Sequence, residues 1–185
     1  MERTGGGMIF IGVLLPDDLS HRIEGYRRFM NQKYGCRSGH STPLHVTLVP
    51  PFQAQDGLYT KDIASALAKM AIEKKWHKFN AKIDGFDTFG DRTLFAKVLP
   101  STVWSAFRSA VYSTVSAVSP GSLRRDSRPF QPHITVANRD IPSGASTEAL
   151  EYLNELELKT TFPVDNITIF ERQNYLWVIS RKIEL

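Results

Sequence analysis

Two short segments of the chain combine the same residue types at the same spacing. His45-Val46-Thr47-Leu48 and His133-Ile134-Thr135-Val136 each read histidine, aliphatic, threonine, aliphatic. Successive side chains of a β-strand point to opposite faces. Each segment therefore predicts a strand that places an imidazole and a hydroxyl side by side on one face and two aliphatic side chains on the other.

Such pairs suit acid–base chemistry on a phosphate ester. An imidazole titrates at about pH 6.5, so one ring can act as a base while the other acts as an acid near neutral pH. The threonine hydroxyls beside them can donate hydrogen bonds to phosphoryl oxygens as negative charge develops there. We therefore expect the catalytic residues to be His45, Thr47, His133 and Thr135, facing one another across a groove.

Two histidines could also hold a metal ion, and a histidine beside a hydroxyl could belong to a nucleophilic triad. No third ligand stands at a suitable spacing, and the sequence contains neither a His-Glu-x-x-His motif nor a pair of cysteines. It also contains no nucleophile-elbow signature. We expect His21 on a helix surface, His40 in a loop and His77 at the start of a strand. The sequence thus predicts no metal site and no cofactor.

The bulk properties of the chain fit one mildly basic globular domain. It has 185 residues, of which 42% are hydrophobic and 23% charged, and a formal net charge of +4. This charge suits an anionic partner but is too small for a protein that coats nucleic acid. The single cysteine, Cys36, cannot form a disulfide within the chain, which fits a reducing compartment. We expect a cytoplasmic monomer with a flexible tail over residues 1–7 and no membrane segment.

Hydrophobic periodicity predicts strands and helices in alternation after the tail. We expect strands over about 8–15, 45–49, 79–89, 93–99, 133–136, 158–170 and 174–183, and helices over about 17–34, 58–76, 101–118 and 146–156. The prolines at 50 and 51 should end the first motif strand, because proline cannot donate a hydrogen bond to a β ladder.

The two halves of the chain repeat one order of elements. Ile9–Pro16 is similar to Leu94–Pro100, and each precedes a helix, a polar loop and a motif strand. The offset is 84 residues between the two prolines and 88 residues between the motif histidines. A nearly constant offset predicts an internal duplication, about 8–90 and 92–185, within a single domain over 8–185. A pseudo-twofold axis would place the two motif strands on either side of a central groove, where ligands bind.

These motifs and their places resemble the 2H phosphoesterase superfamily, also described as LigT-like or 2′-5′ RNA ligase-like proteins. That family has two His-x-Thr/Ser-x motifs, which His45–Leu48 and His133–Val136 match. The run from His45 to Phe52 is similar to bacterial members in which the first motif leads into a Pro-Phe pair. The resemblance implies an α+β, bilobal duplicated fold, with two antiparallel sheets flanking a central groove and helices on the outer faces.

The resemblance also implies an activity. Members hydrolyse 2′,3′-cyclic phosphate ends of RNA, or small cyclic nucleotides, without a metal, and some join RNA ends through a 2′-5′ linkage in the reverse reaction. It implies that His133 is the general base and His45 the general acid, with the roles exchanged for a reversed substrate. The branch that acts on RNA ends usually has an arginine sooner after the second motif than Arg139.

Further side chains could bind the rest of an RNA 3′ end or a small cyclic nucleotide. Aromatic rings can stack on bases, and arginines can contact phosphates. The candidates are Phe52, Phe130, Tyr175 and Trp177 for stacking, and Arg128 and Arg139 for phosphate contacts. Two alternatives stay open: a module that binds RNA or a nucleotide in the same groove without cleaving it, and a scaffold of unrelated sandwich-like fold in which the motifs lie far apart.

Overall fold

The computed structural model describes residues 7–125 and 127–185, in which four helices and eight strands alternate along the chain. Of the predicted tail over 1–7, only Gly7 lies within the described residues. The elements are β1 Met8–Leu14, α1 Asp17–Tyr34, β2 His45–Gln53, α2 Thr60–Glu73, β3 Phe79–Phe89, β4 Thr93–Val98, α3 Thr102–Val118, β5 His133–Asn138, α4 Ala145–Glu155, β6 Lys159–Val164, β7 Asn166–Gln173 and β8 Leu176–Glu184.

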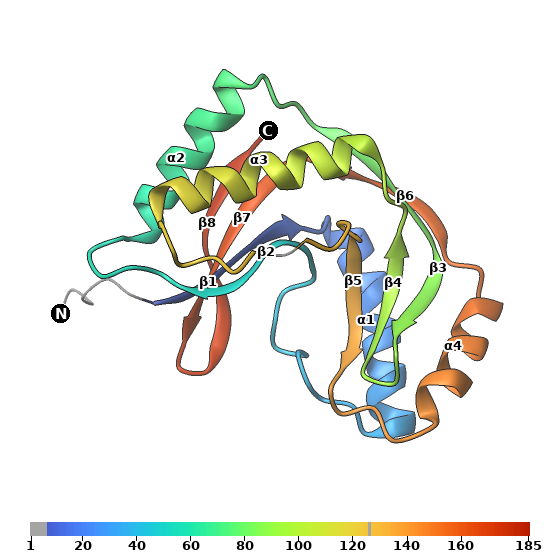
Figure 1. The fold of residues 1–185 in the computed structure, drawn as a ribbon. Helices are drawn as coiled ribbons and strands as arrows, with labels where there is room; N and C mark the ends of the chain where they lie inside the picture. The colour runs from blue at the N-terminus through green and yellow to red at the C-terminus, as the bar shows by residue number, and fades with distance from the viewer. Residues whose placement is uncertain (1–6, 126) are drawn as a thin grey trace.

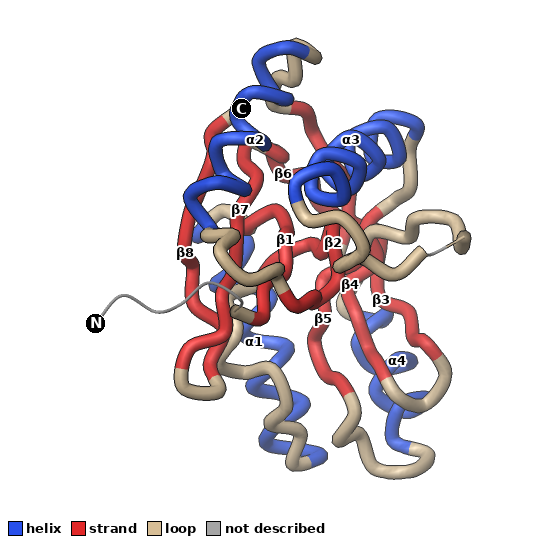
Figure 2. Tube along the Cα trace, turned by 60° about the vertical axis from the view of Figure 1, so that its left-hand side comes forward, coloured by secondary structure: helices blue, strands red, loops and turns tan. Residues whose placement is uncertain are grey.

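The strands form two antiparallel sheets of four, which confirms the predicted fold class (Figure 1). The first sheet has the order β2-β1-β7-β8 and the second the order β5-β4-β3-β6. Helices α2 and α3 pack on the first sheet, whereas α1 and α4 pack on the second. Figure 2 shows the two helix pairs at opposite ends of the molecule, with the strands between them. Helices therefore cover the outer faces, as expected.

Elements cross between the two halves of the chain. Strand β3 belongs to the first half but lies in the second sheet, and β7 and β8 belong to the second half but lie in the first sheet. Helix α1 follows β1 in the chain but contacts β5, and α3 follows β4 but contacts β2. An internal duplication with exchanged elements would give this arrangement, and the duplication itself stays a prediction.

The first motif strand continues through both prolines, which corrects the predicted end at residue 49. Strand β2 runs to Gln53 and is the edge strand of its sheet, so its proline nitrogens can face away from the ladder. The pairing shifts between Ile9↔Phe52 and Ile11↔Val49, where β2 has one residue more than β1. A bulge of this kind accommodates prolines without breaking the strand.

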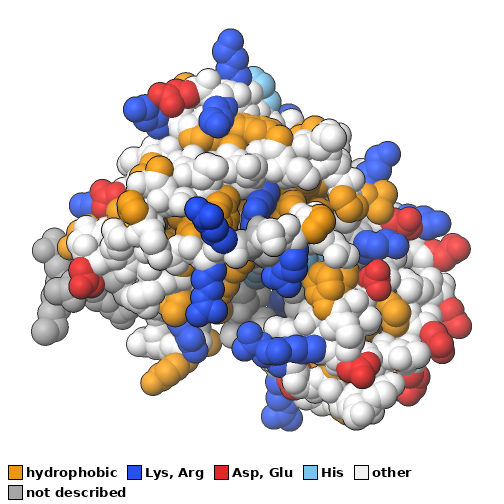
Figure 3. All heavy atoms as spheres, viewed as in Figure 1, with side chains coloured by type: hydrophobic (Ala, Val, Ile, Leu, Met, Phe, Trp, Pro, Cys, Tyr) orange, Lys and Arg blue, Asp and Glu red, His pale blue; other side chains and the backbone are white. Residues whose placement is uncertain are grey.

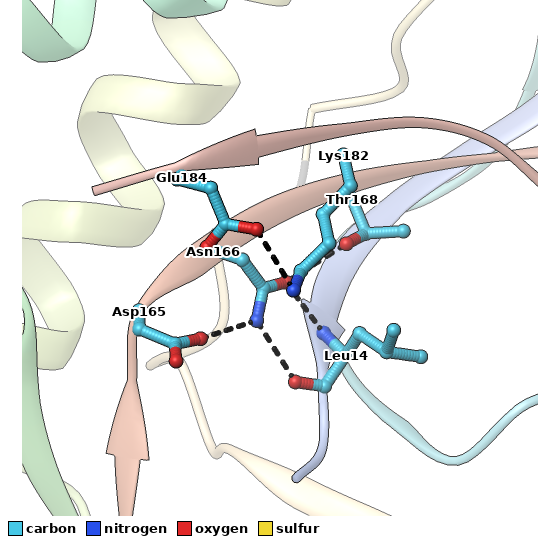
Figure 4. A network of polar contacts seen from close by, with 6 residues as sticks. All are labelled: Leu14, Asp165, Asn166, Thr168, Lys182 and Glu184. Carbon is cyan, nitrogen blue, oxygen red and sulfur yellow. Dashed lines mark hydrogen bonds and ion pairs between the residues drawn. The ribbon is translucent and has the colours of Figure 1, made fainter.

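The predicted strand over 158–170 is two strands, because the chain changes sheets at Asp165. Strand β6 pairs with β3 and strand β7 pairs with β1. Asn166, which is 2% exposed, fixes this junction (Figure 4). Its Nδ2 donates to the Leu14 carbonyl at 3.0 Å and to the Asp165 carboxylate at 2.8 Å. Its Oδ1 accepts from the Leu14 N–H at 2.9 Å and from the Thr168 hydroxyl at 2.8 Å.

The side chain of Asn166 thus makes the two hydrogen bonds that a neighbouring strand would otherwise make with Leu14, at the end of β1 and next to the first motif. Leu14 is the Cα partner of His45 across the β1–β2 ladder. The ion pair between Lys182 and Glu184 on β8, 2.9 Å long, lies over the same junction in Figure 4. The network therefore connects the sheet change to the strand that carries His45.

We predict that Asn166→Ala lowers the free energy of unfolding by about 2–4 kcal/mol, because it leaves buried polar groups of Leu14 and Thr168 without their partner. Urea denaturation would measure the loss. Asn80→Ala, on the exposed face of β3, is the matched control and should change stability by less than about 0.5 kcal/mol. Equal effects of the two substitutions would contradict this role of Asn166.

Candidate active site

The two motif strands are edge strands that meet at the centre of the molecule. Strand β2 ends the first sheet and β5 ends the second, and the two strands contact each other. His45 is the first residue of β2 and His133 the first residue of β5. The two imidazoles are close enough that a charge on His133 lowers the pKa of His45. The alternative of a scaffold with widely separated motifs is therefore wrong.

Within each motif the residues alternate as predicted. Val46 and Leu48 on β2, and the equivalent Ile134 and Val136 on β5, are buried. The histidine and threonine of each motif are half-buried on the opposite face of their strand. The aliphatic side chains anchor each strand in the core, and the polar pair stays accessible on the other face.

The backbone selects the tautomer of both imidazoles. Nδ1 of His45 lies 2.7 Å from the Pro43 carbonyl, and Nδ1 of His133 lies 2.9 Å from the Gln131 carbonyl. A carbonyl oxygen only accepts, so each Nδ1 carries a hydrogen and donates it. In the neutral imidazole the lone pair then resides on Nε2. Both rings consequently offer Nε2 for proton transfer.

Phenylalanine rings from neighbouring strands cover one side of each imidazole. The ring-centroid distances are 4.6 Å from His45 to Phe10, 5.1 Å from His45 to Phe170, 5.0 Å from His133 to Phe89 and 5.1 Å from His133 to Phe95. Aromatic rings exclude water and orient the imidazole by packing. Each histidine thus packs against two phenylalanine rings of its own sheet.

Burial lowers the pKa of both histidines. For His45 it lowers the pKa to about 4; the charges of Arg27 and His133 act in the same direction, and the bond to Pro43 opposes them. For His133, burial also lowers the pKa, against the bond to Gln131. A nearby anion favours the charged form of an imidazole. His45 is therefore neutral near pH 7 in the free protein, and a bound phosphate ester would raise its pKa.

Gly12 permits the close approach of β1 to the first motif. It is the Cα partner of Thr47. A Cβ at this position would lie 2.6 Å from the Val46 carbonyl oxygen and 3.4 Å from Cδ2 of His45. The first contact is shorter than real Cβ atoms make with backbone, so the strand would have to move. Glycine at this position thus allows the imidazole to sit where it does.

Lys97 and the phenylalanine rings are site residues that the sequence did not single out. Lys97 on β4 is the Cα partner of His133, and residues directly opposite in a ladder project from the same face. Its ammonium group therefore belongs to the face that carries the second motif. The spacing of Phe95 and Lys97 indicates that they share one face of their strand. Only the pairing of β4 with β5 shows that this is the face of the second motif.

The predicted substrate-binding residues lie in different places. Phe52 is 5% exposed and pairs with Ile9 on the helix-covered side, so the prediction that it stacks on a ligand is wrong. The reason is the continuation of β2 through the prolines, which turns this ring into the core. Phe130 is half-buried, 6.1 Å from the ring of the core residue Trp104. Trp177 is half-buried, with its ring in edge contact with Phe10 at 4.7 Å.

The remaining candidates are exposed. Tyr175 stands at the turn between β7 and β8 with 89% of its surface exposed. Arg128 lies in the loop that leads into β5. Arg139 follows β5, has a φ of 75° and donates its backbone N–H to the Arg92 carbonyl. In Figure 3, which has the same view as Figure 1, Lys and Arg side chains gather around the hollow in the middle of the visible face.

A cavity of about 500 Å³ adjoins the first motif between α1 and the loop over 40–44. Leu14 and Pro43, which flank His45, belong to its wall. The predicted helix residue His21 and the predicted loop residue His40 also line it, together with two carboxylates and the buried Arg27. Nε2 of His40 is buried and has no hydrogen-bond partner within the described residues.

The described part of the chain contains neither a metal-binding cluster nor a membrane-spanning helix. Between residues 7 and 185, Asp126 excepted, no group of three or more His, Cys, Asp or Glu side chains is arranged to hold a metal ion. Over the same residues, no helix has the length and apolar character needed to cross a membrane.

Comparisons with known proteins agree with this fold. The family model described as the 2′-5′ RNA ligase superfamily matches residues 15–176. The structure of E. coli LigT complexed with 3′-AMP has a TM-score of 0.67 and 16% identity, over 97% of this chain and 98% of that chain.

Two further solved structures have the same fold. The protein TT0787 of Thermus thermophilus has a TM-score of 0.62 and 18% identity, over 96% of this chain and 97% of that chain. Kluyveromyces marxianus Usb1 has a TM-score of 0.52 and 13% identity, over 98% of this chain and 99% of that chain. The comparison with curated proteins found no match.

We predict that acid destabilises the protein through His45. The unfolded chain takes up this proton at about pH 6.5 and the folded protein only at about pH 4. Stability is therefore complete above pH 6.5 and falls as the pH drops toward 4, by on the order of 2 kcal/mol from this group. Urea unfolding near pH 7 and near pH 4.5 should show a smaller difference for His45→Gln than for the wild type. The same replacement of the exposed His77 should leave the difference unchanged.

We also predict that Gly12→Ala destabilises the protein by about 1–3 kcal/mol, because the added methyl group overlaps the Val46 carbonyl. The matched control is Gly25→Ala in α1, where an added Cβ meets only Nη2 of Arg28, at 3.8 Å. That helix substitution should stabilise by about 0.5–1 kcal/mol. Unfolding midpoints that shift in the same direction in both variants would contradict the close-approach role of Gly12.

Proposed function

The chain belongs to the 2′-5′ RNA ligase superfamily, and on this premise we propose that it is a metal-independent phosphodiesterase that opens 2′,3′-cyclic phosphates at RNA ends or in small nucleotides. One observation carries the proposal: two imidazoles on adjacent edge strands have the same backbone-selected tautomer and both offer Nε2. The fold shared with E. coli LigT, whose structure is complexed with 3′-AMP, supports a nucleotide as the ligand.

The proposed reaction needs two proton transfers and no covalent intermediate. One imidazole takes a proton from water, and the water oxygen attacks phosphorus on the side opposite the leaving ribose oxygen. The bond from phosphorus to that ribose oxygen breaks, and the second imidazole gives the oxygen a proton. The product is a phosphate monoester with a free ribose hydroxyl. Ligation to a 2′-5′ linkage is the same displacement with the 5′-hydroxyl of a second RNA end in place of water: that hydroxyl gives its proton to the base, its oxygen bonds to phosphorus, and the 3′ ribose oxygen leaves and receives a proton from the acid.

Burial lowers the pKa of both histidines in the free protein, so burial by itself does not distinguish the acid from the base. A bound phosphate ester favours the charged form of an imidazole, which allows one ring to hold the proton that the leaving oxygen needs. In line with the family resemblance, we propose His133 as the base and His45 as the acid in hydrolysis, with the roles exchanged in the reverse reaction. Because the rings interact, a pH profile reports the pKa values of the pair.

The threonines and the lysine are proposed to bind the phosphoryl oxygens. Thr47 and Thr135 share a strand face with their histidines, and Lys97 lies opposite His133 in the ladder. Hydroxyl donors and an ammonium group stabilise the charge that develops at phosphorus in the transition state. The strand backbone places all three side chains on the faces that carry the histidines.

We predict that His45→Ala and His133→Ala each lower kcat by about 10²–10⁴-fold, and that Thr47→Val or Thr135→Val lowers it by about 10²-fold. The assay is hydrolysis of 2′,3′-cyclic mononucleotides and of cyclic-ended RNA, with EDTA present and without effect. The exposed His77→Ala is the matched control.

Wild-type turnover by the double alanine variant would disprove the assignment. Tight nucleotide binding by the wild type without any product would support instead a non-catalytic RNA-binding or nucleotide-binding module that uses the same groove.

A further inference from the structure

We propose that the β7–β8 hairpin is a binding platform for the single-stranded RNA that precedes the reacting nucleotide, so that the preferred substrate is an RNA 3′ end rather than a free cyclic mononucleotide. The inference rests on the proposed function. It concerns Arg172, Tyr175 and Trp177, and the chain of contacts that connects them to His45.

The contacts run along one face of the first sheet. The ring of His45 lies 4.6 Å from Phe10, and Phe10 lies 4.7 Å from Trp177, with the two planes at 76°. Trp177 is the Cα partner of Arg172, and residues that face each other in a ladder share a face. The guanidinium of Arg172 in turn lies 6.0 Å from the centroid of the Tyr175 ring. Trp177, Arg172 and Tyr175 therefore form an aromatic and basic strip that ends at the hairpin tip, and the buried ring of Phe10 lies between this strip and His45.

Tyr175, at the tip of the hairpin, has a backbone conformation that is unfavourable for an aromatic residue. Asn174 and Tyr175 have φ values of 48° and 68°, as in a two-residue turn of type I′. Asparagine tolerates this left-handed region, and glycine is the usual choice at the second position, whereas an aromatic side chain is strained there. Tyr175 is nevertheless 89% exposed and lies outside the hydrophobic core of the described residues, so core packing does not offset the strain. A strained, solvent-exposed ring at the end of a path to an active site points to a ligand.

The chemistry of the strip selects single-stranded RNA. Exposed aromatic rings bind unpaired bases by stacking, and arginine contacts the phosphates between them. Figure 3 shows basic side chains beside exposed hydrophobic ones on the face where Figure 1 places this hairpin. A nucleotide whose cyclic phosphate lies between the two histidines has its chain neighbour on the 5′ side, and the strip is a path for that neighbour. The other face of the same sheet is covered by α2 and α3.

The test measures binding separately from turnover. Fluorescence anisotropy is recorded for a labelled RNA tetranucleotide with an unreactive 3′-phosphate, and the corresponding mononucleotide competes for the site. We expect the wild type to bind the tetranucleotide at least about tenfold more tightly than the mononucleotide. Tyr175→Gly should weaken tetranucleotide binding about tenfold without lowering the urea unfolding midpoint, because glycine relieves the left-handed strain. Tyr175→Phe, which keeps the ring, should retain the affinity.

Charge is tested with a matched pair of variants. Arg172→Gln should weaken tetranucleotide binding and reduce its salt dependence, because a phosphate contact is lost. The control is Lys61→Gln, which also removes an exposed cation near a tyrosine ring, since Nζ of Lys61 lies 5.3 Å from the ring centroid of Tyr59. Lys61 belongs to α2, which covers the opposite face of the first sheet. This control should bind the tetranucleotide as the wild type does.

The outcomes separate the two proposals. Equal affinity of the wild type for the two ligands, or unchanged binding in Tyr175→Gly and Arg172→Gln, would overturn the hairpin inference even if cyclic phosphates are hydrolysed. Loss of binding in these variants but not in Lys61→Gln would uphold it. If binding depends on the hairpin and no cyclic phosphate is turned over, the platform stands and the proposed catalytic function fails.

Discussion

The hydrogen bond from each imidazole Nδ1 to the carbonyl two residues earlier is the interaction on which the rest of the site depends. It fixes ring orientation and tautomer at once, so that Nε2 of His45 and of His133 is available for a proton. Both carbonyls belong to residues just before a strand begins, and neither is committed to a β ladder. Each carbonyl can accept the bond because each histidine is the first residue of its strand, and both strands are edge strands of their sheets.

The loop that supplies the first carbonyl is itself held by the second half of the chain. The carboxylate of Asp140, just after β5, accepts hydrogen bonds from the backbone N–H groups of Arg37 at 2.6 Å and Ser38 at 2.7 Å. The backbone carbonyl of Asp140 also lies 3.7 Å from the buried Cys36 sulfur. On the far side of the first motif, Asn166 holds the end of β1. The approach to His45 is thus fixed by residues that are distant in the sequence, and this preorganisation is what proton transfer between fixed groups requires.

Local sequence patterns predicted the features that depend on the alternation of apolar and polar residues along one strand or helix. The four motif residues, their strand faces and most element positions follow from residue spacing, and the structure confirms those strands and faces. The errors arise where tertiary position overrides a local rule. Prolines end an interior strand but not the edge strand β2, and Phe52 consequently faces the core. The change of sheet at Asp165 depends on a side chain–backbone network across the chain, which no window around residues 158–170 contains. Lys97 requires the β4–β5 register, and the lowered pKa of His45 requires its burial.

The exchange of elements explains why the site forms as one unit. Helix α1 covers the second sheet and α3 covers the first, so neither half of the chain can bury its apolar helix faces without the other half. Apolar burial is the dominant favourable term in folding, and here the buried side chains of both sheets belong to one cluster. The two motif strands are then brought edge to edge by the same burial that stabilises the fold. An arrangement of separate lobes joined by a hinge would leave the imidazole separation to a weak interface, whereas shared strands and helices fix it by the packing of the core.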